Sequence, residues 1–360
     1  MRKKRKIALY NPYLNIFGGG EKHILSILQV FDRAGYKIDV LWNDKSVKDQ
    51  INTDLNLKFN NLTVIDNFLL NEKISQKTIR TAIYDYFFYI SDGSYFFSLA
   101  GHNYIFAMVP DRKLYDLTLK NRLKLLNWKF ISNSGFTQNK LNALGIKSEY
   151  IYPYINTAID RQIIKKEKII LTVGRFFPYL HNKNHKIIIE LFKKFRRKSD
   201  LFKGNKLVLA GRCDSKDMAY LRDLKSLVKD DTDISLEVNV SHMRLLDLYR
   251  QARFYWHFTG YGIDESKHPE QVEHLGLSPL EAMSGQCLVF CFKAGGIKEL
   301  VKDGFNGYLF TDENDLYNKM ITAMNTNAAD LKIRKNASDY IKKNFSYEVF
   351  ESNVKKFFHI

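Results

Sequence analysis

The chain has 360 residues, of which 45% are hydrophobic, 14% aromatic and 26% charged. This composition is that of a globular and not a disordered protein, and the length exceeds what one compact core usually holds, so we expect two domains. The 56 Lys and Arg residues outnumber the 39 Asp and Glu residues, and the net charge of +17 favours an anionic partner such as nucleic acid, an acidic membrane surface or a phosphorylated ligand.

The first half of the chain alternates short apolar runs with helical patterns. After three glycines at 18–20, apolar residues from Ile24 to Phe31 recur at helical spacing and predict a helix. The aromatic-rich stretch 78–110 predicts further strands with an intervening helix, and another helix is expected at 138–145. Further strands are predicted from the apolar runs at 6–11, 37–42, 62–65 and 129–134.

The pattern restarts after a linker near Tyr154–Ile164. The βαβα order in both halves predicts an α/β protein with two open parallel sheets, each covered by helices on both faces. We place an N-terminal Rossmann-like domain at 1–155 and a second at 156–345, with a C-terminal helix at about 346–360 that suits either. The later strands are predicted at 168–175, 206–211, 234–240, 252–258 and 287–292.

Cysteine usage and the N-terminus bear on the compartment. Cys213, Cys287 and Cys291 have no metal-ligand spacing, and core packing in a reducing cytosol explains them. The basic start MRKKRKIALY lacks the long apolar segment of a signal peptide, and no apolar stretch is long enough for a membrane-spanning helix. We therefore expect a cytoplasmic protein.

Two glycine- or cation-bearing loops follow predicted strands. Gly18-Gly19-Gly20 allows close approach of a ligand to the backbone at a helix start, although the spacing is not that of a dinucleotide fingerprint and a plain tight turn explains it equally well. In VGRFFPYLHNKNH, a strand ends at Gly174 and the loop carries Arg175 and Lys183. Two cations beyond a strand end suit a diphosphate; a solvated basic loop is the alternative.

The stretch EHLGLSPLEAMSG carries two carboxylates around a predicted helix start. Ser278 as N-cap, Pro279 at the first position and Glu281 at the third predict a capping box. This leaves Glu273 and Gly276 unexplained. A helix start suits phosphate and nearby carboxylates suit hydroxyl groups, so a nucleotide sugar matches both features.

In order along the chain, NPYLNIFGGGEKHI, ISNSGFTQNKLNALGIKSEYIYPYIN, VGRFFPYLHNKNH, FYWHFTGYG, EHLGLSPLEAMSG and AGGIKELVKDGFNGYLF resemble the motif blocks of a known family. The chain is similar over nearly its whole length to retaining GT-B glycosyltransferases of family 4, the glycosyl transferases group 1. The resemblance implies two Rossmann-like domains with parallel sheets that face each other across a deep cleft. The N-terminal domain would bind the acceptor and the C-terminal domain the nucleotide sugar.

The family's residue roles carry over by position. Glu273 would contact the donor sugar and Glu281 the ribose, while Arg175 and Lys183 would neutralise the diphosphate and backbone near Val240 would meet the base. The resemblance also implies these further donor-side and cleft residues: Gly174, Gly211, Gly276, Leu277, Gly18, Gly19, Gly20, His102 and His257.

Some positions depart from the family pattern. The gap from Arg175 to Lys183 is longer than usual, which makes Lys186 a rival cation. Where relatives often carry a histidine in the N-terminal domain, this chain has Met108-Val109-Pro110, and His102 is nearby but not aligned. His257 has no clear role, and a buried, hydrogen-bonded core histidine is an equal alternative.

The resemblance implies transfer of a hexose-type sugar from a UDP-, GDP- or dTDP-sugar to a glycan or lipid-linked glycan in cell-surface polysaccharide synthesis, without metal or cofactor. The basic run Arg2–Lys6 suits an anionic membrane surface on the inner face of the membrane, or is simply solvated. A nucleic-acid-binding protein is the alternative from charge, although no recognised motif supports it. An epimerase or a phosphorylase on the same fold is a further alternative.

Overall fold

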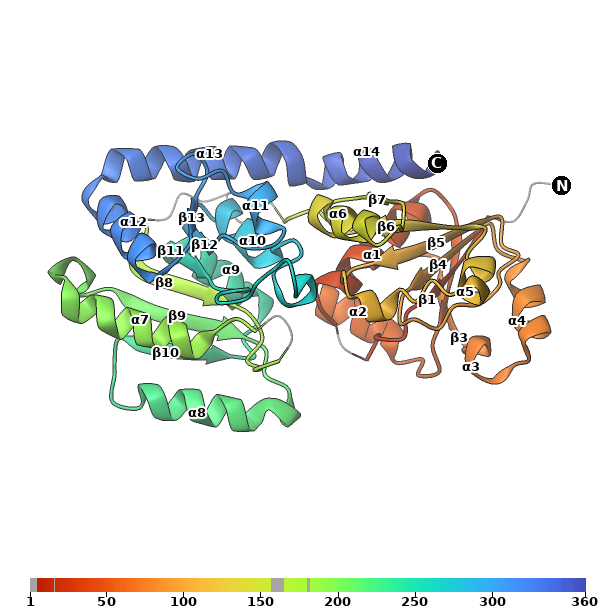
Figure 1. Ribbon diagram of the computed structural model, residues 1–360, viewed down its shortest axis with the longest axis horizontal. Coiled ribbons are helices and arrows are strands. Elements are labelled where there is room, and N and C mark those ends of the chain that lie inside the picture. Colours follow the sequence, from red (N-terminus) through yellow and green to blue (C-terminus); the bar gives the residue numbers. More distant parts are fainter. Residues whose placement is uncertain (1–4, 16, 157–164, 180–181) are drawn as a thin grey trace. The chain divides into compact units, whose positions relative to one another are not determined.

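The computed structural model describes residues 5–15, 17–156, 165–179 and 182–360 (Figure 1). The chain divides into two compact units: unit 1 comprises Met1–Tyr154 and Glu348–Ile360, and unit 2 comprises Ile155–Tyr347. The linker predicted near Tyr154–Ile164 falls mostly on residues 157–164, outside the described residues.

Unit 1 is built on a parallel sheet whose strand order is β3-β2-β1-β4-β5-β6-β7. This is the doubly wound order: β2 and β3 are added on one side of β1, and β4 and the later strands are added on the other side, so the order reverses between β1 and β4. Its strands are β1 (Lys6–Tyr10), β2 (Lys37–Leu41), β3 (Leu62–Ile65), β4 (Tyr86–Ile90), β5 (His102–Ala107), β6 (Trp128–Ser132) and β7 (Ser148–Tyr150).

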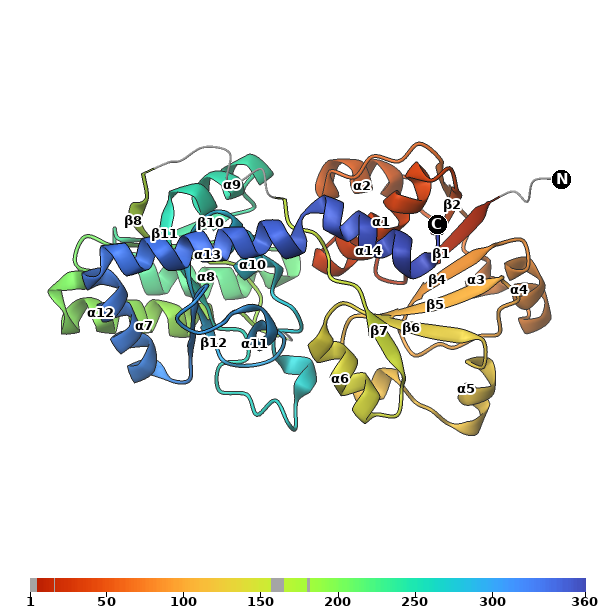
Figure 2. The ribbon, with the colours of Figure 1, turned by 90° about the horizontal axis from the view of Figure 1, so that it is seen from above.

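Helices cover both faces of this sheet (Figures 1 and 2). The strands are therefore almost continuously apolar, as YFFYI of β4 illustrates, because both sides of each strand are buried. The helices are α1 (Gly19–Arg33), α2 (Val47–Leu55), α3 (Phe68–Asn71), α4 (Ile74–Thr81), α5 (Leu119–Lys124), α6 (Gly135–Ala143) and α14 (Tyr347–Phe358).

The C-terminal helix α14 completes the core of unit 1. The Phe358 ring packs 5.1 Å from that of Phe31 in α1 and 5.0 Å from that of Tyr104 in β5, and the Tyr86 hydroxyl donates to the Phe358 carbonyl at 3.1 Å. This apolar face, rather than proximity in sequence, returns the end of the chain to unit 1.

Unit 2 repeats the same plan. Its sheet is parallel with the order β10-β9-β8-β11-β12-β13, and the reversal falls between β8 and β11. The strands are β8 (Glu167–Val173), β9 (Lys206–Gly211), β10 (Ile234–Val238), β11 (Ala252–His257), β12 (Leu288–Phe292) and β13 (Tyr308–Phe310). The helices are α7 (His185–Lys198), α8 (Met218–Val228), α9 (His242–Gln251), α10 (Leu277–Ser284), α11 (Ile297–Leu300), α12 (Glu313–Asn325) and α13 (Asn327–Phe345).

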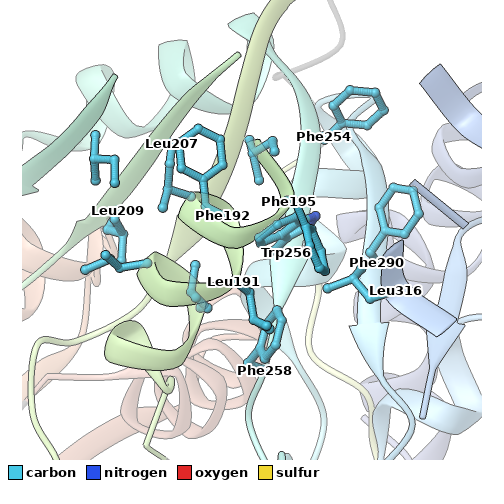
Figure 3. Packing of buried hydrophobic residues seen from close by; sticks show 14 of the residues in the cluster. Leu191, Phe192, Phe195, Leu207, Leu209, Phe254, Trp256, Phe258, Phe290 and Leu316 are labelled. Carbon is cyan, nitrogen blue, oxygen red and sulfur yellow. The ribbon is translucent and has the colours of Figure 1, made fainter. Parts of the chain in front are cut away.

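The core of unit 2 forms where α7 and α12 pack on the sheet. Figure 3 shows Phe192 and Phe195 of α7 beside Trp256 of β11, with Phe290 and Leu316 nearby. The Trp256 ring lies 6.0 Å from that of Phe195, edge to face, and all these side chains are buried. The packing fixes β11 and so the residues that follow it.

The fold class predicted from the sequence is confirmed, and each predicted strand run coincides with an observed strand. The helix expected inside 78–110 is wrong, because residues 91–101 between β4 and β5 form a loop. Among the described residues, no helix combines the length and apolarity needed to cross a membrane.

Candidate functional site

The carboxyl ends of β8 and β11 adjoin at the reversal point of the unit 2 sheet. Ligands of doubly wound proteins bind outside the strand ends at this point, since the connecting helices leave to opposite sides and open a crevice there. Gly174 follows β8 and His257 ends β11. These two residues therefore mark the candidate site.

Lys183 and Glu273 meet at this strand edge. Lys183 Nζ lies 2.9 Å from Glu273 Oε2 and donates to Thr259 Oγ1 at 3.0 Å. Both charged side chains are largely buried, with 16% and 14% of their surface exposed. The Lys183 stem runs over Gly174, where a Cβ atom would lie 2.4 Å from Lys183 Cγ, so a side chain at position 174 would displace the lysine.

His257 adds a third group to this pair. It is 2% exposed, and its Nε2 lies 3.0 Å from Glu273 Oε2, in a geometry that is not a full hydrogen bond. Burial lowers the pKa of His257 although Glu273 opposes the shift, which keeps the ring neutral at pH 7. His257, whose role the sequence did not decide, thus contacts the carboxylate predicted to bind the sugar.

The charge of Glu273 follows from these neighbours. Burial by itself would raise the pKa of this carboxyl group, but the Lys183 charge and the contact with His257 hold the pKa well below its usual range. At neutral pH the site therefore contains one carboxylate, one ammonium and one neutral imidazole. Such a set offers acceptors for hydroxyl groups next to a cation for phosphate.

Gly295 and Gly296 contact the backbone of Glu273 and hold it in place. Gly296 N–H donates to the Glu273 carbonyl at 2.7 Å, and Gly295 has a φ of +69°, where a Cβ atom would lie 2.1 Å from the same oxygen. Gly295 N–H also donates to Glu265 Oε2 at 2.7 Å, and Glu265 pairs with Lys298. Sequence reasoning missed Glu265, Thr259 and their anchoring roles.

The helix start predicted around Ser278 is corrected by the structure. Helix α10 begins at Leu277 after Gly276, whose φ of +102° makes it a left-handed N-cap without a side-chain bond. Glu281 is thus the fifth helical residue and not part of a capping box. Its carboxylate accepts a hydrogen bond from the buried Tyr249 hydroxyl at 2.9 Å.

The two cations of the basic loop are placed differently. Arg175 is exposed, and its guanidinium lies 4.8 Å from the centre of the Phe177 ring. Lys186 is also exposed and pairs with Asp223 at 3.3 Å, so Lys183 and not its rival joins Glu273. Arg175 adjoins Gly174 at the same strand end.

The ends of β9 and β10 complete this edge. A Cβ atom at Gly211 would lie 1.9 Å from the Gly174 carbonyl oxygen, so the chains can approach this closely at a glycine. Asn239, with a φ of +53°, accepts from Cys213 N–H at 2.8 Å and donates its own N–H to the Gly211 carbonyl at 2.8 Å. Val240, the predicted base contact, follows directly.

In unit 1 the glycine loop leads into α1. Gly18 N–H donates to Glu21 Oε2 at 3.0 Å, and a Cβ atom at Gly20 would lie 2.1 Å from Met108 Sδ. Gly19 begins α1. The structure thus brings the glycines and Met108 together near the strand ends.

His102 stands apart from these groups. It begins β5, so it lies at the edge where the parallel strands start, and its ring stacks on Tyr86 at 4.9 Å. The structure does not bring His102 to the glycine loop. His257, the other predicted cleft histidine, belongs to unit 2 with Glu273.

Within the described residues, no group of three or more His, Cys, Asp or Glu side chains is arranged to hold a metal ion. The Lys183–Glu273–His257 cluster pairs its carboxylate with a cation of its own.

Comparison with known proteins identifies relatives of the chain. The family described as "Glycosyl transferases group 1" matches residues 156–343, just over half of the chain. The mouse "GDP-Man:Man(3)GlcNAc(2)-PP-Dol alpha-1,2-mannosyltransferase" is 26% identical over 239 residues, which cover 61% of this chain and 46% of that protein. The "Alpha-1,3/1,6-mannosyltransferase ALG2" of Rhizomucor pusillus is 24% identical, over 51% of this chain and 47% of its own length. The chain therefore spans about half the length of the curated relatives it matches.

Among solved structures, Anabaena Alr3699/HepE, determined in complex with UDP and glucose, superimposes with a TM-score of 0.74 at 15% identity and covers 99% of both chains. At this identity the likeness establishes the fold, which is that of two Rossmann-like parallel-sheet domains.

Proposed function

The chain belongs to the glycosyl transferases group 1 family, and from this premise we propose that it is a retaining glycosyltransferase that moves a hexose-type sugar from a nucleotide sugar to a glycan or lipid-linked glycan. The family and GT-B fold predicted from the sequence are confirmed. Unit 2 would bind the donor and unit 1 the acceptor.

The observation that carries this proposal is the Lys183–Glu273–His257 cluster at the reversal point of the unit 2 sheet. Among the described contacts, Glu273 and Thr259 take two of the three N–H donors of the Lys183 ammonium. The third donor suits a diphosphate oxygen, while the second oxygen of Glu273 suits a sugar hydroxyl. Arg175, exposed at the same strand end, would supply the second cation.

These residues suit a transfer in which the departing diphosphate, and not a protein side chain, accepts the proton of the acceptor hydroxyl group. The bond between the anomeric carbon and the diphosphate oxygen breaks as the acceptor oxygen bonds to that carbon on the same face. The acceptor proton moves to the departing diphosphate. The protein then contributes positioning and charge stabilisation: Lys183 and Arg175 stabilise the negative charge that develops on the diphosphate.

The donor and acceptor are proposed from the relatives' names. The mouse relative is named for GDP-mannose and a dolichol-linked acceptor, and the Anabaena structure holds UDP and glucose. GDP-mannose and UDP-glucose are therefore the first donors to test, followed by a dTDP-sugar. A lipid-linked acceptor would place the protein at the inner face of a membrane in cell-surface glycan synthesis. Of the basic run proposed to contact the lipid, residues 2–4 lie outside the described residues.

A donor screen tests the proposal. Thermal unfolding of the full chain is measured with UDP, GDP, dTDP and their sugars, and one nucleotide class is expected to raise the melting temperature selectively. Incubation of the stabilising donor with glycan acceptors should then release free nucleoside diphosphate. Formation of an isomeric nucleotide sugar without release would favour an epimerase, and no stabilisation by any nucleotide would refute the proposal.

A further inference from the structure

Unit 1 carries an unusual concentration of exposed apolar side chains. Half of the large hydrophobic residues that are well exposed in the described part of the chain fall between Leu70 and Leu126. They include Ile79 at 65%, Leu99 at 57% and Leu126 at 80% exposure. A soluble surface rarely gathers so many apolar side chains without a partner.

These residues meet in one place. Helix α4, the loop before β5 and the segment around α5 together line a groove of about 490 Å³. We define the apolar patch as the five large hydrophobic residues that line this groove. Ile74 and Leu119, the first residues of α4 and α5, are exposed as well but are not part of the patch. The patch consists of Ile79, Phe97, Leu99, Leu123 and Leu126.

The charges around the patch indicate what covers it. Helix α4 (ISQKTIRT) and helix α5 (LKNRLK) carry basic residues and no acidic ones. Basic residues on the same helices as exposed Ile and Leu are typical of a surface that lies in the interface of an anionic bilayer, where aliphatic side chains enter the acyl boundary and cations meet the headgroups. Protein interfaces instead are depleted in Lys.

The position of the patch supports the same partner. Leu99 and Leu126 of the patch lie just before β5 and β6, so the patch lies on the side of the sheet where these strands begin. Arg5, which precedes β1, lines a cavity at this edge together with Gly101 and His102. The described end of the basic N-terminal run is therefore on the same side as the patch.

We propose that the apolar patch docks unit 1 onto an anionic lipid bilayer, with Ile79, Leu123 and Leu126 entering the interface and Lys77 and Lys120 meeting the headgroups. This docking goes beyond the proposed glycosyl transfer and does not depend on it. The glycine loop at 18–20 follows the opposite end of β1, so patch substitutions leave the candidate site untouched.

Vesicle co-sedimentation of the full chain tests the proposal. The protein should bind phosphatidylcholine vesicles that contain phosphatidylglycerol and should not bind phosphatidylcholine alone. The variant Ile79→Ser/Leu123→Ser/Leu126→Ser should lose more than about tenfold of its partition. The matched control Met243→Ser/Leu331→Ser removes equally exposed residues of unit 2 and should bind as the unsubstituted chain does.

The charges are tested separately. Lys77→Gln/Lys120→Gln should weaken partition about fivefold for each lysine. Lys216→Gln/Lys229→Gln replaces two exposed lysines of unit 2 and removes the same net charge. This control variant should change the partition only by the small effect of lowering the overall charge. Hydrogen exchange of the unsubstituted chain provides a readout that needs no variant: vesicles should slow exchange in 74–81 and 119–126.

Three results would overturn the proposal. One is partition that does not depend on anionic lipid. A second is equal binding by the patch triple variant and its control. The third is a concentration-dependent dimer without lipid that the patch variant dissociates, which would show that a second copy covers the patch. The donor screen is independent, so its failure leaves these results interpretable.

Discussion

Replacing Glu273 with glutamine keeps its shape but removes the charge that Lys183 faces at 2.9 Å. At that distance and an effective dielectric constant of about 20, the attraction is roughly 6 kcal/mol, and desolvation of the two groups offsets much of it. Because both side chains retain about one-sixth of their exposure, we expect a coupling of about 2–3 kcal/mol. Glu273→Gln and Lys183→Met should each destabilise unit 2 by about 3 kcal/mol, and the double variant by little more than either alone.

The assay is native-state hydrogen exchange of β8 and β11 amides, which reports the free energy of unfolding of unit 2 by itself. Glu237→Gln is the matched control, since Glu237 pairs with Arg244 in a more exposed setting and should cost under about 1 kcal/mol. Strictly additive effects of Lys183→Met and Glu273→Gln would refute the reasoning that the two form a desolvated pair. In parallel, Glu273→Gln should lower turnover by more than about tenfold, and near-normal turnover would remove Glu273 from the site.

Three further predictions follow from other contacts. Burial lowers the pKa of His23 to about 3, so below about pH 6.5 the unfolded chain binds more protons than the folded chain. The free energy of unfolding, measured by urea titration, should therefore decrease as the pH is lowered from about 6 to about 4. In His23→Leu this slope should be smaller by about 1.4 kcal/mol per pH unit. Gly211→Ala places a Cβ atom 1.9 Å from the Gly174 carbonyl and should cost about 3 kcal/mol or more in hydrogen exchange of unit 2, whereas Ser215→Ala should be near neutral. EDTA should leave turnover unchanged, and loss of activity restored by a divalent cation would contradict a metal-independent transfer.

The local pattern of the chain was sufficient for its strands and its fold class. Buried parallel strands need runs such as KIILTV and LVFCF, and amphipathic helices need the spacing seen in α7, so both are written in neighbouring residues. The intervening helix in 78–110 failed because aromatic residues of the loop 91–101 fill the core between strands without helical periodicity.

Tertiary packing alone decided the details of the site. The capping box at Ser278 matched the local rule, but the close approach of Ile297 to Gly276 and the left-handed conformation of that glycine start α10 earlier. The sequence likewise left Lys183 and Lys186 as rivals. The direction of α7 separated them, since Lys183 lies before the helix and Lys186 on its exposed face.

The sequence by itself determined two parallel sheets covered by helices and the family, because hydrophobic period and motif order are local properties of a chain. The contact of His257 with Glu273, the return of α14 to unit 1 and the gathering of the apolar patch were decided by the tertiary structure. Each joins residues far apart in sequence, and their energy depends on which strand ends and helix faces the fold makes neighbours.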